Sequence, residues 1–134
     1  MAKYSYNSQP VNLTFGYLEA YRELPKHGLD LLSIFDAENT VIQKIMLDDR
    51  VMLDVRFYFL KREGLAADFE ESLEDFTSVQ MQQFREAFWD EVVNFSAPPA
   101  RKALREMWTE AKRQLNSVDR ISTSSSLNSS EDQD

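Results

Sequence analysis

The chain has 134 residues, of which 43% are hydrophobic, so it is long enough for one domain with a single core. Its formal net charge of −8 argues against nucleic acid and anionic membrane surfaces as partners, because both would repel it. The absence of cysteine excludes disulfides, thiol nucleophiles and thiolate metal sites. We therefore expect an acidic globular domain that binds other proteins.

The sequence carries no targeting signal that we recognise. Its opening, MAKYSYNSQP, lacks the apolar core of a signal peptide. No stretch of about 18 apolar residues runs uninterrupted, so no membrane-spanning helix is expected. The simplest expectation is a cytoplasmic protein.

Residues 1–13 alternate weakly between apolar and polar side chains around Pro10. This pattern is equally compatible with a short two-stranded ribbon and with an irregular arm. The alternating apolar residues are Tyr4, Tyr6, Val11 and Leu13.

A short helix is predicted next, because Phe15, Leu18 and either Tyr21 or Arg22 recur at helical spacing until Pro25 and Gly28 end the pattern. Another helical turn, pressed into the core, is expected where apolar residues cluster directly afterwards. Its residues are Leu29, Leu31, Leu32, Ile34 and Phe35.

The most apolar segment spans residues 39–64. Its second half, residues 51–60, alternates well enough to be a buried strand, and periodicity alone leaves that alternative open. The length of the segment favours one helix, as do a possible N-cap at Asn39 or Thr40 and a Schellman ending at Gly64. A further short amphipathic helix with an acidic outer face is predicted through Leu65, Phe69, Leu73 and Phe76.

The clearest helix signal follows Thr77. Thr77 and Gln80 have the spacing of a capping box, and Phe76 and Met81 have that of a hydrophobic staple. Beyond the cap, large apolar residues recur along one helical face, which predicts a helix that buries this face. They are Met81, Phe84, Phe88, Val92 and Phe95.

The sequence SAPP at 96–99 predicts a break and a new helix from Ala100 to Leu115, ending at Asn116. Residues 117–134 hold seven serines and few large apolar side chains, so we expect a disordered, Ser-rich acidic tail. Together these elements predict an all-α fold, a compact helical domain over residues 14–116 built from about five helices.

Charge is spread unevenly over the second half of the chain. Glu63 to Phe95 holds nine acidic residues against one arginine, whereas Arg101 to Leu115 holds five basic residues against two acidic ones. The two helices could simply pack side by side with solvated outer faces. Alternatively, the basic helix could face an acidic patch on another copy or on a partner, where such asymmetry guides association.

Nothing in the sequence predicts catalysis, and we expect neither a metal nor a cofactor. Adjacent carboxylates on a helix diverge by about 100°, so neighbouring acids do not converge on one point. His27 is the single histidine and the chain has three glycines, which leaves no catalytic triad, zinc site or phosphate-binding loop. The acidic pairs are Asp48 and Asp49, Glu70 and Glu71, and Asp90 and Glu91.

Two tryptophans are expected at or near the edge of the core, and a core position is the favoured interpretation for both. Exposed aromatic residues beside arginine or methionine are nevertheless typical of binding hot spots. The candidate protein-binding residues are Phe84, Phe88, Trp89, Arg105 and Trp108.

Three stretches carry a resemblance: LTFGYLEAYRE near the start, the central DDRVMLDVRFYFLKREGL, and a Q-x-x-x-F-R-x-A-F helix. Over residues 11–115 the chain resembles the small tail assembly chaperones of tailed bacteriophages. The resemblance implies a non-enzymatic protein that binds the long tape measure protein, through apolar helix faces, while the tail assembles around it. The alternatives are an acidic adaptor or inhibitor of a host protein, and a minor virion subunit of the connector or baseplate.

Overall fold

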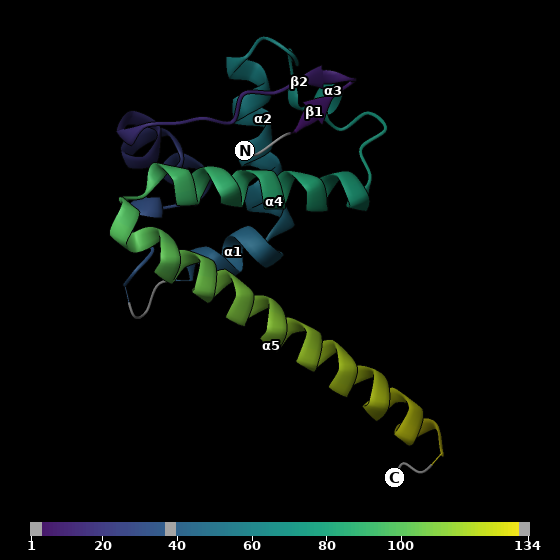
Figure 1. Ribbon diagram of the computed structural model, residues 1–134. Coiled ribbons are helices and arrows are strands. Elements are labelled where there is room, and N and C mark those ends of the chain that lie inside the picture. The colour runs from purple at the N-terminus through teal and green to yellow at the C-terminus, as the bar shows by residue number, and fades with distance from the viewer. Residues whose placement is uncertain (1–3, 37–39, 132–134) are drawn as a thin grey trace.

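The structure, a computed structural model, describes residues 4–36 and 40–131, with side chains described as far as Leu115. This part of the chain is mostly helical, with a two-stranded sheet near the N-terminus (Figure 1). The predicted all-α fold is therefore confirmed. The α-helices are α1 (Val41–Leu47), α2 (Asp49–Arg62), α3 (Phe69–Ser72), α4 (Ser78–Phe95) and α5 (Pro98–Glu131).

Of the two alternatives for the N-terminal segment, the structure shows the two-stranded ribbon and not the irregular arm. Strands β1 (Ser5–Tyr6) and β2 (Gln9–Pro10) pair antiparallel across a tight turn. Asn7 and Ser8 form this turn with positive φ angles of 51° and 66°. The four alternating residues of this segment point inward and are all buried: Tyr4, Tyr6, Val11 and Leu13.

The segment after the ribbon is helical as predicted, but after one α-helical turn it continues as a π-helix, η1 (Glu19–Glu23). Leu24 donates its backbone N–H to the Glu19 carbonyl at 2.8 Å, five residues back. Since a π-turn holds more residues than an α-turn, the expected apolar face does not form. Of that face only Phe15 is buried, whereas Leu18 and Tyr21 are exposed.

Two 3₁₀ turns follow, η2 (Pro25–His27) and η3 (Leu31–Ser33). Gly28 ends η2 in the left-handed conformation, with φ of 88°, which a residue with a side chain adopts only with strain. η3 is the predicted turn in the core, because Leu31 and Ile34 are buried there.

The central apolar segment forms two helices and not one. Asp48 has extended φ and ψ angles of −90° and 94°, which breaks the chain between α1 and α2. Its Oδ1 atom then accepts a hydrogen bond from the Val51 backbone at 3.1 Å and so caps α2. The strand alternative for residues 51–60 is wrong, because all of them lie in α2.

The end of α2 is the predicted Schellman motif. Gly64 has φ of 73°. Its N–H donates to the Lys61 carbonyl at 3.0 Å, and the Leu65 N–H donates to Leu60 at 2.8 Å. At the start of the segment Thr40 occupies the N-cap position without a side-chain bond, and Asn39 lies outside the described residues.

The next two helices begin at side-chain caps. α3 is a single turn capped by Asp68 and is shorter than the amphipathic helix predicted here. α4 carries the full capping box: the Gln80 N–H donates to Thr77 Oγ1 at 3.3 Å, and the Thr77 N–H donates to Gln80 Oε1 at 2.9 Å.

The inward face of α4 forms the centre of the core. The Phe88 ring lies 5.8 Å from Phe84, 6.0 Å from Phe59 of α2 and 5.9 Å from Phe15, measured between ring centroids. The predicted stripe is buried except at its end, where Phe95 is half-buried. The helix therefore joins α2 and the segment before η1 through one aromatic cluster.

One charged side chain lies inside this core. Arg56 of α2 is only 3% exposed. Its Nε donates to the Tyr4 hydroxyl and its Nη1 to the Ser72 carbonyl, both at 2.6 Å, and its guanidinium lies 3.9 Å from the centre of the Phe76 ring. Arg56 therefore holds the ribbon, α3 and the entry to α4 against α2.

Helix α5 packs on α4 and α1 and then extends away from the body of the protein (Figure 1). Its backbone is helical to Glu131, beyond the predicted end at Asn116. The predicted disordered tail spans residues 117–134. The side chains of these residues lie outside the part of the chain that the structure describes. None of the described helices combines the length and the apolar character that crossing a bilayer requires.

The first prediction tests the aromatic core. Phe88→Ala should lower the free energy of unfolding by about 3–5 kcal/mol, because Phe88 is fully buried and the truncation leaves a cavity. Val79→Ala is the control, since Val79 lies on the exposed side of the same helix and should change stability by less than about 0.5 kcal/mol. Urea denaturation followed by circular dichroism measures both, and equal effects would contradict the core position of Phe88.

A second prediction tests the contacts of Arg56. Tyr4→Phe keeps the ring but removes the acceptor of Arg56 Nε, so it should cost about 1.5–3 kcal/mol in the same assay. Tyr17→Phe removes a hydroxyl from an exposed ring and should be neutral. A neutral Tyr4→Phe variant would mean that the ribbon contributes little to the stability of the fold.

Candidate functional site

The structure separates the five candidate binding residues into two groups. Phe84 and Phe88 are completely buried in the aromatic core. Trp89, Arg105 and Trp108 instead line one groove between α4 and α5, which we call the Trp groove. The protein-binding role of all five stays a prediction, but only the second group borders an open surface.

The floor of the Trp groove is a stacked pair of indoles. The rings of Trp89 and Trp108 lie 4.6 Å apart between centroids and 13° from parallel. Both side chains are nearly buried, as the core interpretation predicted. The indole N–H of Trp108 is buried and has no hydrogen-bond partner among the described residues. The groove above them has a volume of about 590 Å³.

The walls of the Trp groove carry opposite charges. α4 contributes Glu86 and Asp90, and α5 contributes Arg105 and Lys112. Lys112 Nζ lies 2.9 Å from Glu86 Oε2, so the basic helix does pair with its acidic neighbour within the chain. No ion pair joins Arg105 to a carboxylate in the part of the chain that the structure describes. This end of the groove therefore offers a free cation beside the aromatic floor.

Three members of the acidic pairs named above make contacts that support the fold. Asp48 caps α2, Asp49 forms an ion pair with Arg85, and Glu71 accepts a hydrogen bond from the Ala67 N–H at 2.9 Å. No group of three or more potential metal ligands comes together among the described residues.

Two further titratable groups lie against the core. Burial raises the pKa of Glu91 above its usual value, and the negative charge of Asp90 acts in the same direction. The ring of His27 lies 6.0 Å from the ring of Tyr58, in a half-buried position. Neither group lines the Trp groove.

Sequence reasoning missed a second surface, formed by Tyr17, Leu18 and Tyr21 at the first helical turn. We call it the η1 surface. Tyr17 is 72% exposed, Leu18 56% and Tyr21 75%, although each is a large apolar or aromatic residue. The Tyr17 ring lies 4.9 Å from the ring of Phe95, at the end of α4. Helical periodicity placed Leu18 and Tyr21 on one face with Phe15, and only the structure shows that these two side chains are exposed.

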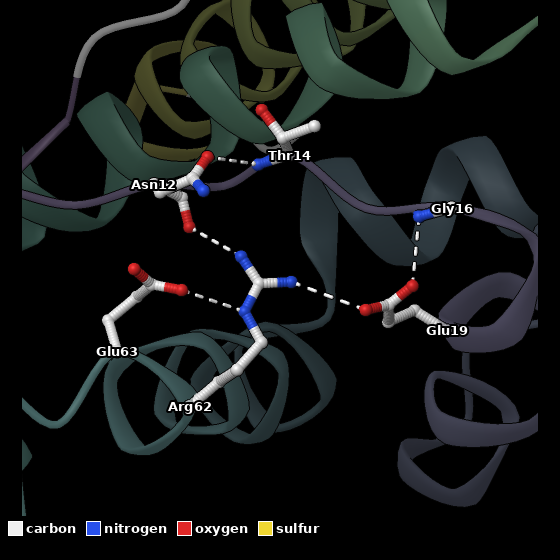
Figure 2. Close-up of polar contacts among 6 residues, drawn as sticks. All are labelled: Asn12, Thr14, Gly16, Glu19, Arg62 and Glu63. Atoms are coloured by element: carbon white, nitrogen blue, oxygen red, sulfur yellow. Dashed lines mark hydrogen bonds and ion pairs between the residues drawn. The ribbon is translucent and has the colours of Figure 1, made fainter.

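Arg62, near the end of α2, holds the η1 surface in place (Figure 2). The guanidinium donates to the Asn12 carbonyl at 2.8 Å and to Glu63 at 2.9 Å, and it forms an ion pair of 3.5 Å with Glu19 of η1. The same Glu19 carboxylate accepts a hydrogen bond from the Gly16 N–H at 2.9 Å. The start of the turn that carries the η1 surface, and the chain just before it, are thus tied to α2.

A third feature is a groove between η3, α1 and α5, which we call the acidic groove. It has a volume of about 590 Å³ and mainly apolar walls, including Ile34, Ile42 and Met107. Phe35 stands at its side and is 53% exposed. Its charged lining residues are all carboxylates: Asp36, Glu106 and Glu110.

No protein-family model matches this chain, and neither a curated protein nor a solved structure matches it.

A third prediction tests the anchoring of η1. Arg62→Lys keeps the charge but loses the forked contact to Asn12, Glu19 and Glu63, so η1 should open more often. Hydrogen exchange of the backbone amides in residues 16–24 should become about tenfold faster, which corresponds to about 1.4 kcal/mol. Lys61→Arg, at the exposed neighbouring position, is the control and should leave these rates unchanged.

Proposed function

We propose that this chain is a non-enzymatic tail assembly chaperone that binds a helical segment of the tape measure protein. The observation that carries the proposal is the Trp groove, where an aromatic floor lies between charged walls on two long helices. The resemblance of residues 11–115 to such chaperones supplies the identity of the partner.

The chemistry of the Trp groove suits an amphipathic helix. Tryptophan and arginine are the residues that contribute most at protein interfaces, and here they border one open groove. An apolar stripe of the partner would cover the exposed edges of the indoles. The two charge signs on the walls would then favour one direction of the bound helix over the other.

The same arrangement gives no support to catalysis. The carboxylates nearest the groove, Glu86 and Asp90, lie on one wall and face lysine and arginine across it. Glu86 is paired with Lys112, and it also accepts a hydrogen bond from Gln82 at 2.9 Å. These contacts favour recognition of another protein over acid–base chemistry.

The test is co-expression with the tape measure protein encoded by the same genome. The wild-type chain should keep that protein soluble and co-purify with it. Arg105→Glu reverses the free cation of the Trp groove and should weaken the complex at least about tenfold in a titration of the purified proteins. Lys102→Glu is the matched control, because Lys102 is exposed on the same helix but does not line the Trp groove.

Purified virus particles provide a second measurement. A chaperone leaves before assembly is complete, so the chain should be absent from finished particles. Its presence there would instead identify a connector or baseplate subunit. Failure to bind or solubilise the tape measure protein would overturn the proposal directly.

A further inference from the structure

The η1 surface has cations at its edge. Arg22 directly follows Tyr21 and Lys26 lies in the next turn, and their side chains are 57% and 61% exposed. Both pair with Glu23, whose side chain is only 22% exposed. The part that reaches solvent is therefore apolar at its centre and positive at its edge.

The acidic groove has the opposite chemistry. Its walls are apolar, and its charged residues are carboxylates without a lining cation. Glu110 is partly neutralised by Arg113, at 2.6 Å. Among the described residues, no ion pair involves Asp36 or Glu106. The groove therefore suits an apolar segment that carries lysine or arginine.

These two surfaces are neighbours in the fold. η1 packs against η3, and η3 together with the residues after it supplies Ile34, Phe35 and Asp36 to the acidic groove. Because the surfaces lie next to each other, a second copy related by a two-fold axis can satisfy both at once. Two-fold contacts of this kind are the commonest among protein oligomers, and they close without growing into chains.

We propose that this chain forms a symmetric dimer in which the η1 surface of each copy is seated in the acidic groove of the other. Tyr17, Leu18 and Tyr21 then lie against the apolar walls of the partner copy, and Arg22 and Lys26 face the carboxylates at its edge. The contact covers the largest exposed aromatic side chains of the described protein. It leaves the Trp groove open, so the dimer is independent of the proposed function.

The experiment uses two charge-reversed variants of the full chain. The groove variant carries Asp36→Lys and Glu106→Lys, and the η1 variant carries Arg22→Glu and Lys26→Glu. All four positions are exposed, so both variants should fold like the wild type, as circular dichroism will verify. Sedimentation velocity over a dilution series measures the dimer dissociation constant of each.

The wild type should dimerise, and higher salt should weaken the dimer because the edge charges are solvated. Each variant alone should dimerise at least about tenfold more weakly, since like charges then face each other. An equimolar mixture of the two variants should recover dimers, because each reversed surface meets its reversed counterpart. This recovery distinguishes a specific contact from non-specific association.

Matched controls change the same net charge elsewhere. Arg50→Glu with Lys61→Glu, and Asp54→Lys with Glu74→Lys, all lie at exposed positions outside both surfaces and should leave the dimer intact. A monomeric wild type, undiminished dimers in either reversed variant, or no recovery in the mixture would overturn the proposal. So would species that keep growing beyond the dimer. None of these results depends on the tape measure protein, so failure here leaves the chaperone proposal standing.

Discussion

The fold depends on a buried arginine that has no carboxylate partner among the described residues. Arg56 donates hydrogen bonds to the Tyr4 hydroxyl and to the Ser72 carbonyl, and its guanidinium lies over the Phe76 ring. Burying a guanidinium is costly unless its donors are satisfied, so the surrounding elements must all be in place together. The ribbon, α3 and the start of α4 come from separate parts of the sequence, yet they share this one side chain. Burial also raises the pKa of the Tyr4 phenol, which keeps the acceptor neutral, although Arg56 acts in the opposite direction.

Around this centre, the molecule divides its aromatic residues between two tasks. Phe15, Phe59, Phe84 and Phe88 fill the core and hold α2 against α4. The indole pair and the tyrosines of the η1 surface lie at its boundary, where an apolar ring can either complete the core or contact a partner. This division explains why grooves and exposed rings occur on a small chain that has a complete core of its own.

Local rules predicted two of the helix ends correctly. The capping box at Thr77 and the glycine ending at Gly64 depend on backbone groups within one turn, so the sequence around them is sufficient. The break at Asp48 was missed, because apolar periodicity continues across it and an aspartate can serve a helix interior or a cap. The apolar face predicted around η1 was wrong for a related reason, because a helical wheel assumes the 100° per residue of an α-helix and η1 is a π-helix. The Trp groove was predictable in its residues but not as a groove, since only packing brings α4 and α5 together.

The contacts that Arg56 makes differ in kind from those that hold η1. The Tyr4 phenol and the Ser72 carbonyl are neutral acceptors, so the attachment of the ribbon to α2 involves no second charge. The attachment of η1 differs, because Arg62 binds two carboxylates, Glu19 and Glu63, as well as a carbonyl. Salt screens charge pairs near the surface more than contacts inside the core. The ribbon is therefore held by contacts that ionic strength hardly changes, whereas η1 is held in part by pairs that salt weakens.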